Sequence, residues 1–499
     1  MRVSLGHDGG VMRMNFPLVR DPGVSLSRRR LLAGAGALSL GVGLGGCQST
    51  AGTELQALTT GTPNVGLLDD LERRTFDFFW ETTDAATGLA PDRWPTPSFC
   101  SVAAVGFALT AYCVGVARGY VTRAQARGRV LTTLRTFRDA PQGPQATGVA
   151  GHKGFYYHFL DMKTGLRFDR CELSTIDTTL FLAGALCCQS FFDSSDAPET
   201  TLRSLVDELY GRVDWRWAQV RSPLIGHGWH PETGFIASDW KAYDESMILC
   251  LLALGSPTQP VDASAWGAWA SGLPAAWGQE YGQTFVRFAP LFGHQFTHCW
   301  VDLRGVQDDF MRARGMDYFE NSRRATLAQR AYAIANPQGW AGYGPDFWGI
   351  SACDGPADVE REFGGRLRRF ISYAGRGMGL YDDGTLTPYA AGSSIAFTPE
   401  IVLTALQAMK DRYGAALYGR YGFFDAFNPS FTFTDVKLTH GRVLPDLGWV
   451  DTDHLGIDQG PMLAMLGNHR GEVVWSAMRR NAHLRRGMER AGFRGGWLG

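Results

Sequence analysis

Residues 101–118 read SVAAVGFALTAYCVGVAR, and residues 122–138 read TRAQARGRVLTTLRTFR. The first stretch is apolar nearly all round, which predicts a helix that is buried on both sides. The second is amphipathic with basic residues on its outer face, which predicts a helix that borders solvent. An apolar stretch at 173–192 and an amphipathic stretch at 199–217 repeat this pair. Alternating buried and outer helices are what a closed double ring of helices requires.

The other helical segments continue the alternation along the chain. They are 67–83, 243–254, 319–335, 397–413, 459–466 and 471–481. No long strand-rich or low-complexity segment interrupts them. We therefore predict an all-α chain with one domain at residues 66–499, folded as an (α/α)6 toroid. Such a ring leaves a central cleft bordered by the loops at the N-terminal ends of its inner helices.

The composition favours a neutral ligand over a polyanion. The 499-residue chain has a net charge of −1, 19% charged residues and 12% aromatic residues. This balance gives no electrostatic field that would attract nucleic acid. No P-loop, dinucleotide fingerprint, Ser nucleophile elbow or Cys-x-x-Cys spacing occurs in a supportive context. We expect a monomer without cofactor or metal that acts on a hydroxyl-rich substrate.

The first 47 residues resemble an export signal. Residues 27–32, SRRRLL, precede an Ala/Gly-rich apolar run that ends in LGGC at residues 44–47. A basic region, a short apolar region and small residues before a cleavage site indicate a signal peptide and not a membrane span. The paired arginines predict the twin-arginine route, and LGGC resembles a lipobox, which would make Cys47 a lipidated N-terminus. A Sec signal with an incidental cysteine is the alternative.

Residues 48–65 are rich in Thr, Gly and Ala and predict a flexible tether after the signal. Together with Cys47, this tether would attach the globular domain to a membrane through a lipid. The expected location is therefore the periplasm or the outer membrane.

Carboxylates gather immediately before one apolar helix. Residues 168–178, FDRCELSTIDT, contain Asp169, Glu172 and Asp177. Ser174 could cap this helix while Asp177 meets the helix dipole, which would be a purely structural role. Capping needs one acid, however, and three acids exceed that need. A catalytic or binding role is therefore the competing hypothesis.

A second acid stands beside aromatic residues at the start of another apolar helix. Residues 239–260, DWKAYDESMILCLLALGSPTQP, place Trp240, Tyr243 and Glu245 there. Aromatic faces suit the C–H surfaces of sugars, and a partly apolar setting raises the pKa of a carboxyl group. Glycoside hydrolysis requires two carboxyl groups that flank the scissile bond. Acids at the two helix starts could supply this pair, although capping remains the alternative for each.

Residues 294–304, HQFTHCWVDLR, contain two histidines four residues apart. On a helix, His294 and His298 could share a metal ion, but the glutamate of the usual metalloprotease pattern is missing. Recognition of sugar hydroxyl groups by His298 and Asp302 is therefore favoured over a metal site.

Several blocks resemble the bacterial glucoamylase-like domain family, which includes endo-β-1,2-glucanases of glycoside hydrolase family 144 and domains of cyclic β-1,2-glucan synthases. The resemblance covers residues 67–493. Its blocks are HQFTHCWVDLRG, DYFENSRRATLAQRAYAIANP, GYGPDFWGISACDGP, DDGTLTPYAAGSSIAFTPE, RYGFFDAFNP and LGIDQGP.

The resemblance implies an (α/α)6 enzyme that hydrolyses β-1,2-glucan, endo-acting and inverting, without a cofactor. It further implies Glu172 as the proton donor, with Asp169 or Glu245 as the partner on the base side. The residues expected to line sugar subsites are Asp177, Trp240, Tyr243, His298, Asp302, Tyr318, Asn321, Arg323, Trp348 and Asp354.

One departure from the family pattern concerns the substrate. The LGIDQGP block is usually followed by Ile-Glu-Asn, whereas this chain has Gly467 at the glutamate position. We expect this change to reshape a sugar subsite. The alternatives are an exo-acting or transglycosylating enzyme on a different β-glucan, and a non-catalytic glycan-binding lipoprotein.

Overall fold

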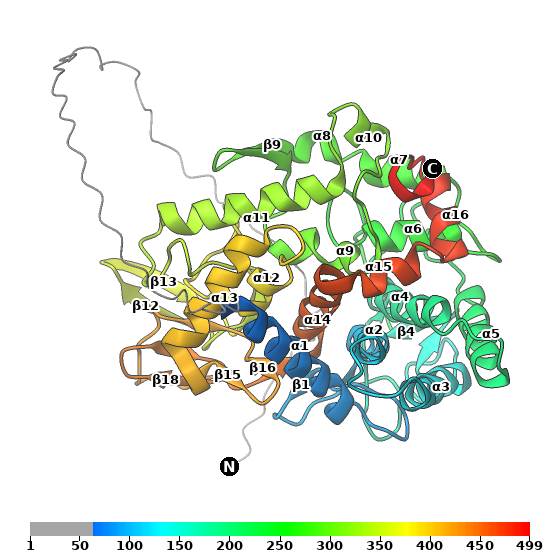
Figure 1. Ribbon diagram of the computed structural model, residues 1–499, viewed down its shortest axis with the longest axis horizontal. Helices are drawn as coiled ribbons and strands as arrows, with labels where there is room; N and C mark the ends of the chain where they lie inside the picture. Colours follow the sequence, from blue (N-terminus) through cyan, green and yellow to red (C-terminus); the bar gives the residue numbers. More distant parts are fainter. Residues whose placement is uncertain (1–62) are drawn as a thin grey trace, which may run out of the picture.

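The computed structural model describes residues 63–499 (Figure 1). The predicted signal, Cys47 and nearly all of the predicted tether lie outside the described residues. Helix α1 spans Pro63–Thr82 and so begins a few residues before the predicted helix at 67–83. Within residues 63–499, no helix is both long and apolar enough to cross a membrane.

Four helices are buried along most or all of their length and form the centre of the molecule. They are α2 (Val102–Ala117), α4 (Thr175–Phe191), α6 (Met247–Gly255) and α14 (Gly456–Gly471). Helix α2 packs against both α4 and α14. At its crossing with α4 the two backbones touch, because a Cβ added to Gly106 would lie 2.2 Å from the Leu180 carbonyl oxygen. A side chain at Gly106 would therefore force the two helices apart.

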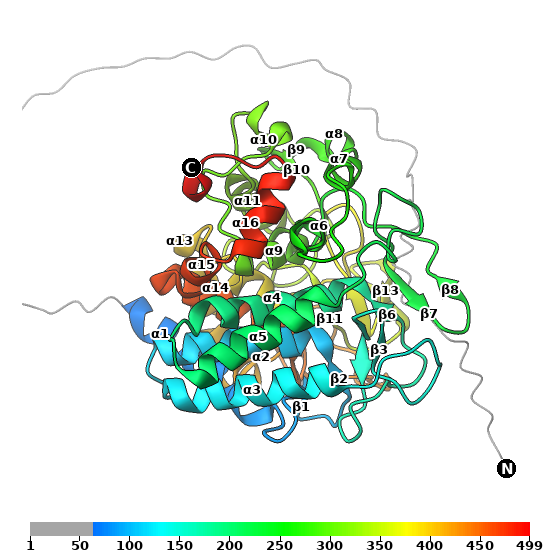
Figure 2. The same ribbon diagram turned by 90° about the vertical axis from the view of Figure 1, so that its right-hand side faces the viewer.

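Amphipathic helices cover this centre. They are α1, α3 (Arg123–Asp139), α5 (Ala197–Gly211), α11 (Tyr318–Ala335), α13 (Pro399–Tyr413) and α16 (Ala482–Arg490). Figure 2 shows α2, α3, α4 and α5 running side by side. A capping box at Thr122 and a side-chain cap at Asp196 start α3 and α5. Both caps occupy backbone N–H groups that would otherwise lack partners.

Shorter helices connect these layers. They are α7 (Ser264–Ala270), α8 (Leu273–Ala276), α9 (Phe296–Trp300), α10 (Asp309–Arg312), α12 (Pro388–Gly392) and α15 (Val473–Met478), with 3-10 segments at Leu291–His294, Gly414–Ala416 and Gly496–Leu498. Helices are therefore the predominant regular structure within residues 63–499, as the sequence predicted.

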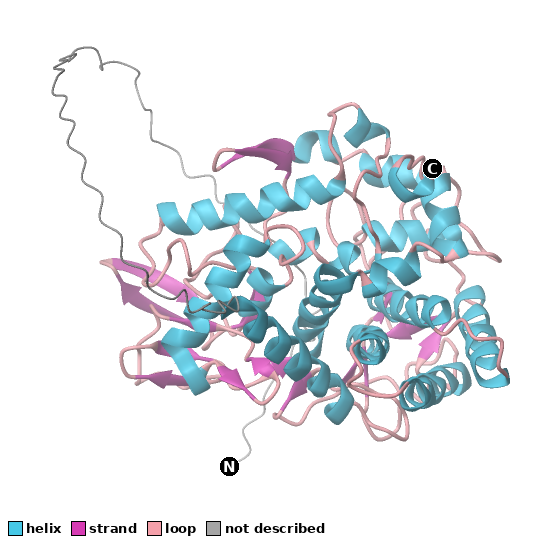
Figure 3. Cartoon of the chain, viewed as in Figure 1, coloured by secondary structure: helices cyan, strands magenta, loops and turns pink. Residues whose placement is uncertain are grey.

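Short antiparallel strands correct the strict all-α prediction (Figure 3). The largest sheet has the order β3–β4–β6–β7–β8, formed by Gly151–His152, Phe155–Tyr157, Leu173–Ser174, Gly228–His230 and Gly234–Phe235. A three-stranded sheet has the order β17–β19–β18, formed by Phe427–Asn428, Gly448–Val450 and Arg442–Leu444. Strands this short are below the length at which alternating hydrophobicity becomes visible in a sequence.

The other strands form pairs. They are β1 (Arg93–Trp94) with β20 (His454–Leu455), β2 (Cys100–Ser101) with β5 (Phe159–Leu160), β9 (Trp277–Glu280) with β10 (Gln283–Val286), β11 (Ala352–Asp354) with β14 (Tyr373–Gly375), β12 (Val359–Phe363) with β13 (Arg366–Phe370), and β15 (Tyr418–Gly419) with β16 (Gly422–Phe423).

Three of these strands fix the beginnings of buried helices. Strands β2, β6 and β20 end one residue before α2, α4 and α14 begin. Ser174, the last residue of β6, caps α4 by accepting a hydrogen bond from the Asp177 N–H group. The first turns of these helices are thereby held at the strand ends, and those of α4 and α14 carry Asp177 and Asp458.

Candidate active site

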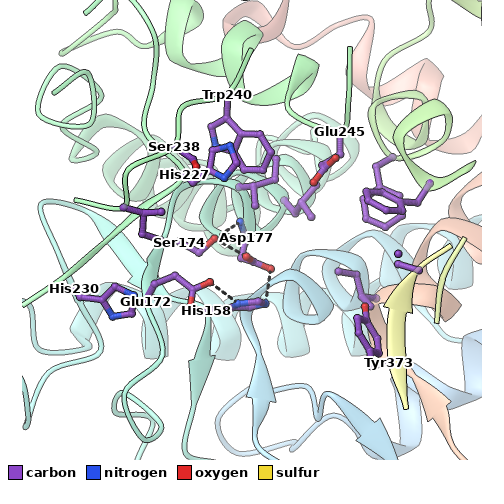
Figure 4. Close-up of a pocket in the computed structure, with 18 of the residues that line it drawn as sticks. His158, Glu172, Ser174, Asp177, His227, His230, Ser238, Trp240, Glu245 and Tyr373 are labelled. Atoms are coloured by element: carbon purple, nitrogen blue, oxygen red, sulfur yellow. Dashed lines mark hydrogen bonds and ion pairs between the residues drawn. The ribbon is translucent and has the colours of Figure 1, made fainter. Parts of the chain in front are cut away.

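A pocket of about 730 Å³ lies where the N-terminal ends of α4 and α14 meet the loop before α6 (Figure 4). Strands β11 and β14 and the segment around β8 complete its lining. Its polar side chains are concentrated in four acids and three histidines, which are Glu172, Asp177, Glu245, Asp458, His158, His227 and His230. The expected cleft at the N-terminal ends of inner helices is therefore present.

His158 lies between two of the acids. Its Nδ1 is 2.9 Å from Glu172 Oε1, and its Nε2 is 3.4 Å from Asp177 Oδ1. Figure 4 shows the imidazole ring between the two carboxylates. Burial would lower the pKa of His158, but the charges of Asp177 and Glu172 raise it to about 9. His158 is therefore an imidazolium at neutral pH.

The same contact fixes the protonation state of Glu172. Burial would raise its pKa, but the charge and hydrogen bond of His158 lower it to about 2. Glu172 is then ionised over the whole neutral range and has no proton to give. This environment opposes the proton-donor role that the family resemblance implied for Glu172.

Replacing His158 is expected to destabilise the protein in a pH-dependent way. Its folded pKa of about 9 exceeds its ordinary value of 6.5, so its stabilisation is complete below pH 6.5 and is lost as pH rises through about 9. We expect His158→Gln to lower the free energy of unfolding by roughly 2–3 kcal/mol at pH 6 and by much less at pH 10. Urea unfolding of both proteins at these two pH values measures the difference. An equal loss at both pH values would show that the charge of His158 is not involved.

Glu245 lies in the turn immediately before α6 and is 7% exposed. Its Oε2 atom has no hydrogen-bond partner within the protein, although it is buried. Burial, followed by the charges of Asp244 and Asp177, raises the pKa of Glu245 well above its usual range. The raised pKa favours the protonated form of this pocket-lining carboxyl group, which is what a general acid requires.

Asp458 is a second acid with a free oxygen atom. It lies in the first turn of α14, is 3% exposed, and its Oδ2 atom has no hydrogen-bond partner. Burial raises its pKa to about 8, with a further upward contribution from Asp354 and Asp92. By contrast, Asp177 accepts a hydrogen bond from Ser174 and contacts His158. Glu245 and Asp458 are thus the pocket acids that form no ion pair with a basic side chain among the described residues.

The apolar part of the pocket contains aromatic rings. Trp240 is 7% exposed, stacks on His227 with the ring centroids 3.9 Å apart, and donates from Nε1 to Thr175 Oγ1 at 2.9 Å. The remaining aromatic lining residues are Phe235, Phe292, Phe296, Tyr373 and Tyr389. Rings held rigidly beside carboxyl groups suit the mixed polar and apolar surface of a sugar.

Four predicted site residues, Glu172, Asp177, Trp240 and Glu245, line the pocket. Asp169 does not, and this corrects its assignment as a catalytic candidate. It is exposed in the turn before β6, where its backbone φ is 47°. An exposed carboxylate outside the pocket cannot serve a reaction inside it.

Another group of predicted sugar contacts packs in the interior, away from the pocket lining. Tyr243 stacks on Tyr318 with the ring centroids 5.7 Å apart, and its hydroxyl group is 3.3 Å from Ser322 Oγ. Ser322 is in turn 2.9 Å from His298 Nε2, while Asn321 accepts a hydrogen bond from the Val286 N–H group at 2.7 Å. These four predicted contacts, Tyr243, His298, Tyr318 and Asn321, pack in the interior and do not line the pocket.

The last four predicted sugar contacts are ion-paired, exposed or fully buried. Asp302 pairs with Arg304 at 2.7 Å, and Asp354 pairs with Arg93 at 2.7 Å. The Arg323 side chain is 41% exposed, and Trp348 is 0% exposed. None of Asp302, Arg323, Trp348 and Asp354 lines the pocket, so their assignment as sugar contacts is corrected.

Gly467 also lies elsewhere than expected. It is in the C-terminal half of α14, where an added Cβ would lie 2.9 Å from Val114 Cγ2 of α2. It does not line the pocket. A helix-packing position explains the absence of a side chain, and reshaping of a sugar subsite by Gly467 is not supported.

Sequence reasoning missed His158, His230, Tyr373 and Asp458 as pocket residues. Asp458 carried a usable signal, because it is an acid in the first turn of an apolar helix, as Asp177 is. The other three come from separate strands and loops, and only the folded chain brings them together.

Comparison with known proteins identifies the type of domain. Residues 237–482 match the model of the family described as "Glycoamylase: Putative glucoamylase". A solved structure from Bacteroides uniformis, described as a putative glucoamylase, is 27% identical and has a TM-score of 0.75, covering 87% of this chain and 99% of that one. The chain contains a glucoamylase-like domain. The resemblance predicted from the sequence is confirmed.

Two relatives of this glucoamylase-like domain are named for β-1,2-glucans. The endo-β-1,2-glucanase from Chitinophaga pinensis shares the fold, with a TM-score of 0.73 and 24% identity over 87% of this chain and 99% of that one. The exo β-1,2-glucooligosaccharide sophorohydrolase (non-reducing end) from Parabacteroides distasonis is 24% identical over 477 residues. That alignment includes 89% of this chain but 60% of the relative, so the chain spans well under two thirds of that relative's length.

Proposed function

We propose that this protein is a glycoside hydrolase that cleaves β-1,2-linked glucan, with endo action on linear chains. The observation that carries the proposal is Glu245, a buried carboxyl group with a raised pKa and a free oxygen atom in an aromatic-lined pocket. The names of the relatives support β-1,2-glucan as the substrate class.

In the proposed reaction Glu245 donates its proton to the glycosidic oxygen as the bond to the anomeric carbon breaks. Asp458 accepts a proton from the water that attacks this carbon from the opposite side. The pKa of Asp458 is raised to about 8, so the carboxylate form that accepts this proton predominates only above about pH 8. We propose inversion at the anomeric carbon, because direct attack by this water inverts that centre.

The remaining charged groups would bind and orient the substrate. The ionised Glu172 and the neighbouring Asp177, both held by His158, can accept hydrogen bonds from sugar hydroxyl groups. Trp240 would stack against a sugar ring beside them. We therefore propose that the two acids paired with His158 position the substrate and that the two acids without a basic partner carry out the chemistry.

Exo action is the second candidate, because the curated relative from Parabacteroides distasonis is named as an exo sophorohydrolase. An endo enzyme releases a ladder of oligosaccharides from the first minutes, whereas an exo enzyme releases one small product throughout.

The purified protein should be incubated with linear β-1,2-, β-1,3- and β-1,4-glucans and the products separated over time. We expect a ladder from the β-1,2-glucan alone, with the α-anomer formed first in proton NMR spectra. Oligosaccharide binding without turnover would reject the enzyme and favour a glycan-binding protein. Products longer than the substrate would indicate transglycosylation.

We also propose export by the twin-arginine route and a lipid anchor at Cys47, supported by the sequence at residues 27–47. Mass spectrometry of the N-terminal peptide from the membrane fraction would test the anchor.

For the architecture, we propose that the alternating buried and outer helices complete an (α/α)6 toroid, supported by the alternation of α2 with α3 and of α4 with α5. An experimental structure would test the ring closure.

A further inference from the structure

Three aspartates converge behind the pocket lining. Asp354 ends β11, Asp425 lies between β16 and β17, and Asp451 follows β19. All three are at most 2% exposed. One carboxylate oxygen atom from each lies within 4.8 Å of the others. Asp425 also adjoins Asp458, which lines the pocket.

Backbone N–H groups hold one oxygen atom of two of these carboxylates and leave the other free. The Asp354 N–H group donates to Asp425 Oδ2 at 2.7 Å, and the Thr452 N–H group donates to Asp451 Oδ1 at 2.6 Å. Asp425 Oδ1 and Asp451 Oδ2 are buried without a hydrogen-bond partner. Leaving a buried carboxyl oxygen without a partner is costly, so these two atoms point to a missing ligand.

Positive charge near the cluster is shared among several acids. Arg93 contacts Asp354 at 2.7 Å, but it also contacts Asp92 at 3.4 Å and Asp453 at 3.7 Å. His440 Nδ1 is 3.7 Å from Asp354 Oδ2, and burial lowers the pKa of His440, which favours its neutral form. Arg93 is therefore shared among Asp354, Asp92 and Asp453, and among the described residues neither Asp425 nor Asp451 forms an ion pair.

We propose that Asp354, Asp425 and Asp451 bind a divalent cation of the oxygen-preferring class, with Ca²⁺ favoured over Mg²⁺. Ca²⁺ accepts irregular sets of carboxylate and carbonyl oxygen atoms, whereas Mg²⁺ needs near-octahedral geometry and keeps several waters, which a buried site admits poorly. The cation would link three loops to the first turn of α14. This inference is independent of the proposed glucan hydrolysis, because it concerns stability and not turnover.

The test compares the protein after EDTA treatment and dialysis with the same protein in Ca²⁺. At a Ca²⁺ concentration about 100 times the Kd, we expect Tm to rise by roughly 3–5 °C. Elemental analysis of the purified protein before EDTA treatment is expected to find about one calcium per chain, if the site retains its ion as a buried oxygen cage does.

Two isosteric variants locate the site. Asp425→Asn and Asp451→Asn should both lose the Tm response to Ca²⁺, and in EDTA their Tm should equal or exceed that of the wild type because one repelling charge is gone. Asp435→Asn, at an aspartate whose side chain is 74% exposed, should respond as the wild type does. The proposal is overturned if wild-type protein contains no metal and its Tm ignores Ca²⁺, or if both variants keep the full response. If the wild-type Tm depends on pH but not on Ca²⁺, the three carboxyl groups share protons and do not bind a cation.

Discussion

Glu245→Gln is expected to lower kcat on linear β-1,2-glucan by about 10³-fold, within the range for removal of a general acid. Glutamine keeps the size of the side chain but has no proton to donate to the leaving oxygen. The protonated state of Glu245 follows from burial and from the charges of Asp244 and Asp177. Reducing-sugar assays measure kcat, and calorimetry with an oligosaccharide should show a Kd within a few-fold of the wild type.

A substrate with a good leaving group separates proton donation from other roles of Glu245. A dinitrophenyl leaving group departs without protonation, so the variant should lose at most about tenfold on an aryl β-sophoroside. Glu489→Gln, at an exposed position on α16, serves as the matched control and should retain full activity. An equally large loss on both substrates would reject Glu245 as the acid.

In the wild type, the alkaline limb of the pH profile of kcat should lie well above pH 4.5, and this limb should disappear in the Glu245→Gln variant.

The helices were predictable because the pattern of apolar residues that indicates a helix extends over many residues and repeats along the chain. The apolar stretch at 101–118 corresponds to α2 at Val102–Ala117, and the amphipathic stretch at 122–138 corresponds to α3 at Arg123–Asp139. Errors in the predicted helix boundaries were larger where polar residues precede an apolar run of sequence. The stretch at 243–254 begins four residues before α6 because Tyr243 packs apolar surface without being helical. Burial of one face, and not local propensity, decided such boundaries.

The acids of the site were predictable in part because they occupy helix starts, where an excess of carboxylates is visible in sequence. Glu172 and Glu245 satisfied this criterion, and both line the pocket. Their protonation states were not predictable, since the pKa of Glu172 depends on His158, which lies on a different strand connection. The aromatic and polar residues at 294–323 look like a binding motif in sequence, yet in the fold they satisfy one another in the interior. Sequence pattern shows which residues are unusual, but only packing shows whether their polar atoms remain free.

Asp458→Asn is expected to lower kcat by about 10³-fold on glucan and, unlike Glu245→Gln, by a similar factor on the aryl β-sophoroside. Activation of water is needed whatever the leaving group, so a better leaving group does not compensate for a missing base. Asp458 has no basic partner among the described residues, whereas Asp177 and Glu172 are both paired with His158, and this is the reason to place the base at Asp458.

Azide provides a direct test of this role. It is nucleophilic without a base, so it should restore turnover of the aryl β-sophoroside by Asp458→Asn and yield an α-glycosyl azide, while leaving Glu245→Gln unaffected. Asp411→Asn, at an exposed position on α13, controls for the general effect of the substitution. If Asp458→Asn stays within tenfold of the wild type while Asp177→Asn or Glu172→Gln abolishes activity, the base is one of those acids. The ion pairs of His158 would then hold the base itself, and the pH dependence of catalysis would follow the titration of His158 near pH 9.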